Sequence, residues 1–192
     1  MGEKEVMELL EETEALLSGH FLLSSGLHSP RYIQCARLLQ YPWHAERIGR
    51  ALAEKVRSLG PFGAVVGPAL GGILVAHELG RALGVRALFV EREGQRFALR
   101  RGFALALGER VLIAEDVVTT GGSTLETAEV VVAHGGQVVA AACIVDRRAA
   151  PQTLPFPVFS SVQLPIPTYP PEACPLCRAG VPLEKPGSRP RG

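Results

Sequence analysis

The chain has 192 residues, 47% of them hydrophobic, which is enough to bury the core of one domain. Its 20 basic and 19 acidic side chains leave a net charge of +1, which argues against nucleic-acid binding. No apolar run approaches the ~20 residues of a membrane helix, and the acidic amphipathic start lacks a signal-peptide pattern. We therefore expect a cytoplasmic protein that binds neither nucleic acid nor membrane. The excess of Arg over Lys and the absence of Asn fit either a thermophile or a GC-rich genome.

The first 60 residues predict two helices with an irregular stretch between them. Apolar side chains on one face predict a helix over 3–18, ended by Gly19. Turn residues over 20–41 predict loops and short strands. Pro42 stands where a first helical position favours proline, so a second helix is expected from there to Gly60.

From residue 64 onward, short apolar runs alternate with helical segments. They predict strands at 64–66, 87–90, 111–114 and 138–145, helices that end near Leu83 and His134, and an edge strand over 158–164. A loop is expected at 117–122, and the charged, glycine-containing residues 91–103 predict an exposed hairpin or a mobile loop. Such alternation is typical of an α/β fold, in which helices cover both faces of a parallel sheet.

The strand at 111–114 is followed by the acids Glu115 and Asp116 and then by a Thr-Thr-Gly-Gly-Ser turn that opens a helix. Closely spaced backbone N–H groups and a helix N-terminus favour a phosphate group. The two acids would repel phosphate unless they face hydroxyl groups or a metal ion. The pattern therefore predicts a ribose 5-phosphate, with its phosphate on the turn and its 2′ and 3′ hydroxyls on the two acids.

Three segments resemble a known family. Residues 111–124 resemble the phosphoribosyl-pyrophosphate (PRPP) signature of the type I phosphoribosyltransferases. Residues 20–30 resemble the N-terminal element of the orotate phosphoribosyltransferases, and 144–147 resemble their strand-end Asp-Arg. The resemblance implies transfer of ribose 5-phosphate from PRPP to N1 of orotate in pyrimidine biosynthesis, with Mg²⁺ on the pyrophosphate and ribose oxygens. The same site could instead serve a purine or xanthine phosphoribosyltransferase, or a non-catalytic regulator that senses PRPP.

The resemblance also implies how the chain is organised. It predicts an α/β domain over 1–165, with a parallel sheet flanked by helices, a small N-terminal hood from about 18–42, and a mobile loop. That loop would reach across a homodimer to act in trans, because its charges cannot be buried unpaired. Residues 166–192 form a Pro-rich tail whose last residues are predicted to be disordered.

Site residues follow from the matched motifs. Glu115 and Asp116 are the expected catalytic residues, together with Arg96, Arg100 or Arg101 of the mobile loop. The other expected PRPP contacts are Ala69, Leu70, Gly71, Arg92, Val117, Val118, Thr119, Thr120, Gly121, Gly122 and Ser123. Thr119 and Arg147 are expected to bind orotate. Mg²⁺ is expected to be held mainly by PRPP, with no side-chain ligand assigned.

Two features stay open at this point. Many members carry lysine at the positions of Ser24, Gly71 and Glu93, so a loop arginine must replace them, and the sequence does not say which. Cys174 and Cys177 form a Cys-Pro-Leu-Cys pair that could bind zinc with a second pair or with Cys35, form a disulfide, or stay reduced. The five histidines show no metal-ligand spacing.

Overall fold

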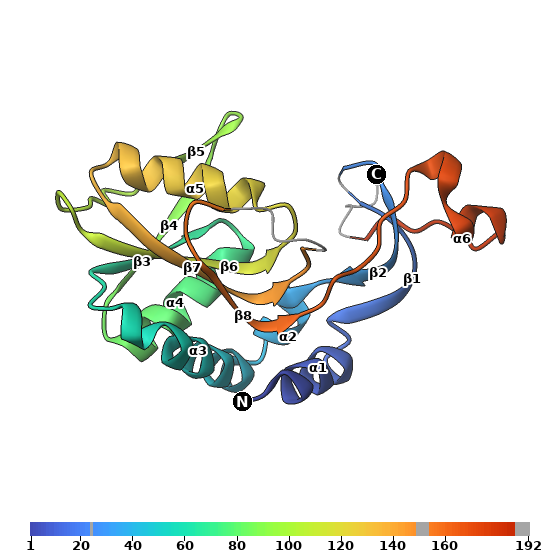
Figure 1. The fold of residues 1–192 in the computed structure, drawn as a ribbon, viewed down its shortest axis with the longest axis horizontal. Coiled ribbons are helices and arrows are strands. Elements are labelled where there is room, and N and C mark those ends of the chain that lie inside the picture. The colour runs from blue at the N-terminus through green and yellow to red at the C-terminus, as the bar shows by residue number, and fades with distance from the viewer. Residues whose placement is uncertain (24, 149–153, 187–192) are drawn as a thin grey trace.

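The computed structural model of the chain describes residues 1–23, 25–148 and 154–186. It contains a six-stranded sheet of order β5-β4-β3-β6-β7-β8 and a separate sheet of β1 and β2 (Figure 1). The strands are β1 (Leu16–Leu22), β2 (His28–Ile33), β3 (Ala64–Pro68), β4 (Arg86–Glu93), β5 (Arg96–Leu99), β6 (Arg110–Val118), β7 (Gln137–Asp146) and β8 (Val158–Gln163). The helices are α1 (Glu3–Glu12), α2 (Cys35–Leu39), α3 (Pro42–Val56), α4 (Gly71–Leu83), α5 (Gly122–Ala133) and α6 (Pro175–Arg178), with 3-10 turns at Arg57–Leu59 and Pro171–Ala173.

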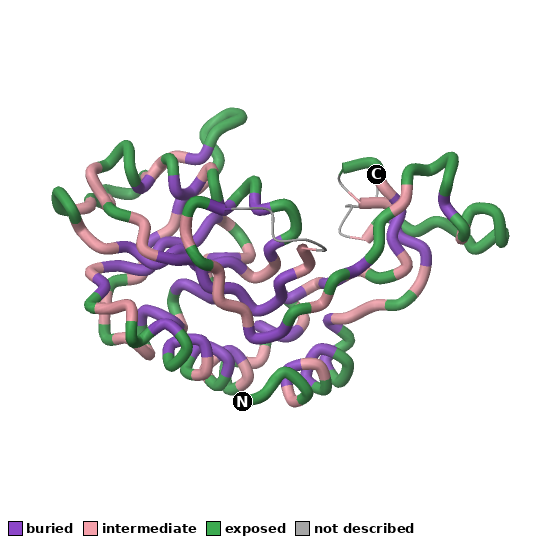
Figure 2. Tube along the Cα trace, in the orientation of Figure 1, coloured by how far each residue is buried: buried purple, intermediate pink, exposed green. Residues whose placement is uncertain are grey.

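The larger sheet confirms the predicted α/β architecture. All its strands pair in parallel except β5, which runs antiparallel to β4 at one edge. Helices α3 and α4 cover one face and α5 covers the other (Figure 1). The central strands are buried on both faces, β3 at every position, as Figure 2 shows. Among the described residues, no helix is long and apolar enough to cross a membrane.

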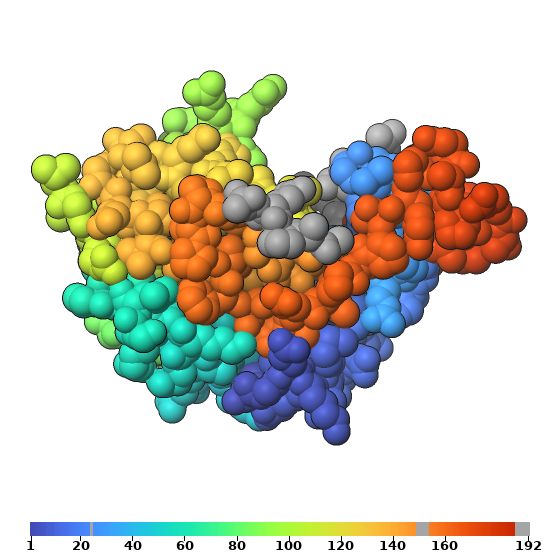
Figure 3. All heavy atoms as spheres, in the orientation of Figure 1, coloured from blue at the N-terminus to red at the C-terminus, as the bar shows by residue number. Residues whose placement is uncertain are grey.

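The hood is built on the antiparallel pair of β1 and β2, which stands apart from the larger sheet. The described part of the tail, 166–186, returns to this pair and bonds to it on both sides. His28 and Tyr169 exchange two backbone hydrogen bonds of 2.8 and 2.9 Å, and Glu184 donates to His20 at 2.8 Å and accepts from Leu22 at 2.7 Å. Hood and tail therefore form one lobe beside the sheet, where Figure 3 shows the red and blue atoms in contact.

The division of the chain at residue 165 stays a prediction, and the expected disorder at the very end falls on 187–192, outside the described residues. Most of the predicted elements are confirmed, including the helix from Pro42 and the edge strand β8. The prediction of one helix over 3–18 is wrong, because Glu14 adopts a left-handed φ of 51° and the chain then becomes extended. From Leu16 onward it pairs with β2 instead of continuing the helix.

Two further boundaries differ from the prediction. The stretch expected to contain only loops and short strands includes the short helix α2, whose Cys35, Leu38 and Leu39 are buried. The loop expected at 117–122 begins later, because β6 continues in register with β7 as far as the pair Val118 and Asp146. This extension keeps Glu115 and Asp116 inside a strand, so their side chains point to opposite faces of the sheet.

Residues 91–103 form the predicted exposed hairpin. Strands β4 and β5 are joined by a tight turn at Gly94, whose φ of 63° suits glycine. The hairpin projects from the body of the molecule beyond α5 (Figure 1).

Candidate functional site

A cleft of about 1340 Å³ lies where the carboxyl ends of β6 and β7 face the hood and the tail. Ligands of open parallel sheets bind at this edge. Seven residues expected from the sequence line the cleft: Leu70, Gly71, Asp116, Val117, Thr119, Thr120 and Arg147. The structure thus brings together residues from three separate segments of the chain.

Asp116 faces the start of α4, at Gly71. A Cβ atom added to Gly71 would lie 2.3 Å from Asp116 Oδ2, so a side chain at position 71 would displace this carboxylate. The Val117 N–H donates to Asp116 Oδ1 at 2.9 Å, and burial raises the pKa of Asp116. The glycine at position 71 therefore lets the carboxylate stand beside the backbone of the 69–71 loop.

Glu115 points away from the cleft and is 5% exposed. Burial, together with the charge of Asp116, raises the pKa of Glu115 to about 8, although a hydrogen bond with Thr124 opposes this rise. From the sequence we expect both acids to contact the ribose hydroxyls, but of these two the structure brings only Asp116 to the cleft wall. Glu115 instead joins the end of β6 to the first turn of α5.

The turn between β6 and α5 offers backbone donors. Thr119 and Thr120 are exposed, and Gly121 has a φ of 83° that lets the chain enter α5. No described side chain caps the N-terminus of α5, and the Gly122 N–H has only a long 3.4 Å contact with Thr120 Oγ1. Free N–H groups and the helix dipole make this turn suitable for a phosphate group.

Adjacent arginines at the end of β7 have different roles. Arg148 pairs with the buried carboxylate of Asp146, with Nε 2.9 Å from Oδ1 and a terminal nitrogen 2.7 Å from Oδ2. Both arginines line the cleft, and the buried Nε of Arg147 has no hydrogen-bond partner within the described part of the chain. Burial lowers the pKa of Arg147. A buried guanidinium donor without a partner is costly unless a ligand accepts from it.

Arg92 does not reach the cleft. Its guanidinium pairs with Glu126 of α5 at 2.6 Å and lies 3.9 Å above the centre of the Phe97 ring. Glu126 also accepts from the Phe97 N–H, so it ties the hairpin to α5. In this arrangement Arg92 holds the hairpin in place, and the structure does not bring it together with the other expected PRPP contacts.

The remaining hairpin arginines also lie away from the cleft lining. Arg101 forms a bidentate pair with Glu91 at 2.8 Å, and Arg100 lies 3.6 Å from Glu93. Arg96 makes no ion pair with any residue that the structure describes. The hairpin is exposed and not buried in its own subunit, and Arg100 and Arg101 pair with its glutamates, so the expectation that its charges could not be buried unpaired stays a prediction.

Several cleft residues were not identified from the sequence: Tyr32, Gln34, Cys35, Leu74, Ile166, Thr168 and Lys185. Lys185 is one of only three lysines in the chain and reaches the cleft from the tail. The sequence gives no sign that a Pro-rich tail folds back over the hood. Ser24, a position where many members carry lysine, lies outside the described residues.

Comparisons with a family model and with known relatives assign the chain to the same family. Residues 36–165 match the phosphoribosyl transferase domain. The chain is 50% identical over 190 residues to the orotate phosphoribosyltransferase of Heliobacterium modesticaldum, and 51% over 189 residues to that of Caldanaerobacter subterraneus subsp. tengcongensis. These alignments cover 98% of this chain and 100% and 99% of the relatives.

The fold of the chain is also similar to solved structures of this family. The orotate phosphoribosyltransferase from Aeropyrum pernix superposes with a TM-score of 0.70 at 29% identity, over 83% of this chain and 93% of that one. The enzyme from Mycobacterium tuberculosis, in complex with PRPP, has a TM-score of 0.65 at 27% identity, over 84% and 96% of the two chains.

The raised pKa of Glu115 predicts a pH-dependent stability. In the unfolded chain Glu115 loses its proton near pH 4.5, whereas in the folded chain it holds the proton to about pH 8. Between these values the folded state binds more protons, so Glu115 makes the protein less stable as the pH rises. Replacing Glu115 by Gln removes this pH-dependent loss of stability.

We expect the melting temperature of Glu115→Gln, relative to wild type, to rise between pH 5 and pH 9 in ligand-free protein. Glu129→Gln, at an exposed position on α5, is the matched control and should show no such trend. A melting-temperature difference for Glu115→Gln that is the same at both pH values would contradict the assignment.

Proposed function

The chain belongs to the orotate phosphoribosyltransferases, which transfer ribose 5-phosphate from PRPP to N1 of orotate, and we propose that it does so in the cleft between sheet and hood. The observation that carries this proposal is the cleft itself. The turn that leads into the N-terminus of α5, the carboxylate of Asp116 and Arg147, whose Nε has no partner among the described residues, line it. These features suit phosphate, ribose hydroxyls and an anionic base respectively.

PRPP occupies the sheet side of the cleft. Its 5′-phosphate accepts hydrogen bonds from the turn of residues 119–123, and its pyrophosphate lies along the backbone of 69–71. Asp116 accepts from the ribose hydroxyls. Glu115 acts indirectly, because its hydrogen bond with Thr124 holds the first turn of α5 against the end of β6.

Orotate occupies the hood side. Its carboxylate or a ring carbonyl accepts from Arg147, whose unpaired Nε supports this pairing, and Thr119 contacts the base from the turn. Tyr32 forms part of the facing wall, and Lys185 adds a cation. With Arg148, three cationic side chains line this cleft, and they suit a substrate pair that carries phosphate, pyrophosphate and carboxylate groups.

The reaction breaks the bond between C1′ and the pyrophosphate oxygen and the N1–H bond of orotate, whose proton leaves with the pyrophosphate, and it forms a bond between C1′ and N1. Positive charge develops on the ribose ring between these events. The protein's contribution is to hold the two reactants in line and to stabilise this charge. Asp116 provides the carboxylate in the cleft for both purposes, and the hood and tail that wall the cleft limit the access of water that would hydrolyse PRPP.

A divalent cation fits this site. Mg²⁺ prefers oxygen ligands and is usually bound by substrate phosphates, water and one or two carboxylates. Among the described residues that line the cleft, Asp116 offers it a carboxylate oxygen. When bound with PRPP, Mg²⁺ neutralises charge on the departing pyrophosphate. PRPP itself would supply most of the ligands of the Mg²⁺ ion.

The cytoplasmic location expected from the sequence stays a prediction.

A homodimer completes the site in our proposal. The hairpin of β4 and β5 projects from its own subunit and carries arginines that lie outside its own cleft. Arg96 is the favoured catalytic cation, because Arg100 and Arg101 already face glutamates of the same hairpin. It would reach the pyrophosphate of the neighbouring subunit.

The base specificity tests the proposed function directly. Purified protein is incubated with PRPP, Mg²⁺ and one of orotate, uracil, adenine, guanine or xanthine, and pyrophosphate release is followed. We expect orotate to be preferred and Asp116→Asn to lower its turnover by about 10²-fold or more. A preference for a purine would favour the alternative enzyme, and no turnover with any base would favour a PRPP-sensing regulator. Unchanged turnover in Asp116→Asn would remove Asp116 from the site.

Arg147 and Arg148 provide a matched pair for the orotate contact. We expect Arg147→Ala to raise the KM for orotate at least about tenfold more than the KM for PRPP, because a charge-assisted hydrogen bond is lost. Arg148→Ala should instead lower the melting temperature, since it leaves the buried Asp146 carboxylate unpaired. Steady-state kinetics and thermal unfolding measure both. Equal effects of Arg147→Ala on the two KM values would place Arg147 outside the base subsite.

Subunit mixing tests whether the hairpin acts in trans. One inactive variant carries Asp116→Asn, and the other carries alanine at Arg96, Arg100 and Arg101. After random re-pairing half of the dimers are mixed, and each has one intact site, so activity should return toward about a quarter of wild type. A third variant with alanine at Arg96 alone shows whether this residue accounts for the loss. If exchange is complete by native mass spectrometry and activity stays absent, the hairpin serves its own subunit.

A further inference from the structure

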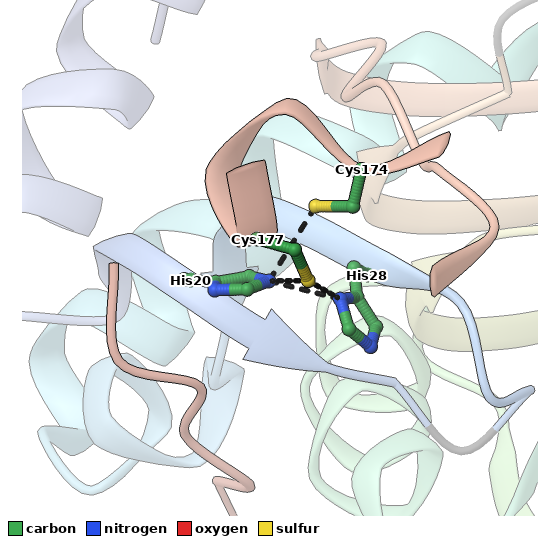
Figure 4. Close-up of side chains that lie close together, drawn as sticks. All are labelled: His20, His28, Cys174 and Cys177. Carbon is green, nitrogen blue, oxygen red and sulfur yellow. Dashed lines mark hydrogen bonds between the residues drawn. The ribbon is translucent and has the colours of Figure 1, made fainter. Parts of the chain in front are cut away.

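Four side chains that the proposed reaction does not use meet between the hood and the tail. His20 lies on β1, His28 at the start of β2, Cys174 just before α6 and Cys177 within it. Figure 4 shows the two imidazoles and the two thiols pointing toward one another from these separate elements. One nitrogen or sulfur atom from each residue lies within 4.8 Å of all the others.

Four of the six distances between these atoms are within about 0.4 Å of those in a tetrahedral zinc site, so small side-chain shifts would let all four residues bind one ion. Zinc bound at 2.0–2.1 Å to nitrogen and 2.3 Å to sulfur places its ligand atoms about 3.3 Å (N to N) and about 3.6 Å (N to S) apart. Here His20 Nε2 lies 2.9 Å from His28 Nδ1, 3.5 Å from Cys174 Sγ and 3.7 Å from Cys177 Sγ. Cys177 Sγ lies 3.2 Å from His28 Nδ1.

The surroundings of the cluster also favour a metal. His20 Nδ1–H donates to the Val181 carbonyl at 2.8 Å, which leaves the Nε2 lone pair directed at the other three residues. Histidines that bind metals commonly donate their second ring N–H to such a carbonyl. His20, His28 and Cys174 are buried, so three of the four ligands are already desolvated and held by packing.

We propose that His20, His28, Cys174 and Cys177 bind one structural Zn²⁺ per chain. Two imidazoles and two thiolates form a closed set of four protein ligands, which is typical of structural rather than catalytic zinc. Binding displaces one proton from each thiol, and no redox change is involved. All four cysteines of the chain are free thiols, so no disulfide competes.

The other partners considered for the cysteine pair fit less well. Cys35 lies on α2, with its Sγ 3.9 Å from the Asp116 carbonyl, and therefore belongs to the surroundings of the cleft. A second pair from another subunit is not needed, because the histidines complete the set within one chain. Their spacing in sequence gave no indication of this, since the two histidines meet only through the pairing of β1 with β2.

The proposed ion would fasten the tail to the hood. Both cysteines lie between Tyr169 and Glu184, the two tail residues whose backbones bond to β2 and β1. A crosslink between His20 and Cys174 closes a long loop of chain, which is where a metal clip stabilises most in principle. Lys185 follows Glu184 directly, so the same clip would hold this lysine at the cleft.

The test uses full-length protein without a histidine tag. Metal content is measured by inductively coupled plasma mass spectrometry, and the Zn²⁺ is then exchanged for Co²⁺. We expect about one zinc per chain, and a Co²⁺ spectrum with tetrahedral d–d bands and a thiolate charge-transfer band. A Cys174→Ser, Cys177→Ser double variant and His28→Ala should each fall below about 0.1 zinc per chain. Cys143→Ala and His77→Ala, outside the cluster, should keep their zinc.

Thermal unfolding gives a second readout. We expect chelation to lower the melting temperature of wild type and to leave the Cys174→Ser, Cys177→Ser variant unchanged, whatever the base specificity of the enzyme. The proposal is overturned if wild type lacks zinc after reconstitution under reducing conditions. It is also overturned if the double variant retains zinc, or if the Co²⁺ protein lacks the thiolate band.

Discussion

The parallel pairing of β6 with β3 on one side and β7 on the other determines where the loops that line the cleft of this enzyme begin. Because the three strands run in the same direction, the 69–71 loop, the turn after Val118 and the Arg147–Arg148 pair emerge at one edge of the sheet. Buried acids then define the chemistry of that edge. Asp146 holds Arg148, while the Nε of the neighbouring Arg147 has no partner among the described residues. Glu115 anchors α5, and Asp116 faces the cleft.

The sheet forms only half of the cleft, and the other half depends on an interaction between distant parts of the chain. The hood is a two-stranded sheet, and an isolated pair of strands is marginally stable by itself. The tail bonds to both of its strands, and the cluster of two histidines and two cysteines lies at their junction. The proposed zinc ion would therefore support the base-binding wall without touching either substrate.

Local patterns in the sequence were enough for the strands, the flanking helices and the motif after β6, because apolar runs and glycine-rich turns reflect short-range constraints. These patterns failed where contacts between residues far apart in the sequence determine the structure. Residues 16–18 continue a helical pattern yet pair with β2, and Glu115 and Asp116 are adjacent in sequence yet point to opposite sides. The partners of Cys174 and Cys177 lie about 150 residues away along the chain, a separation that no local pattern reveals.

A crystal structure with orotidine 5′-monophosphate, the reaction product, would test the central claim most directly, since this ligand carries both the 5′-phosphate and the base. The account predicts phosphate oxygens within about 3 Å of backbone N–H groups in the turn of residues 119–123. It also predicts that Asp116 contacts the ribose hydroxyls and that Arg147 contacts the base. A phosphate bound elsewhere, or a base that leaves Arg147 without a ligand contact, would contradict the account.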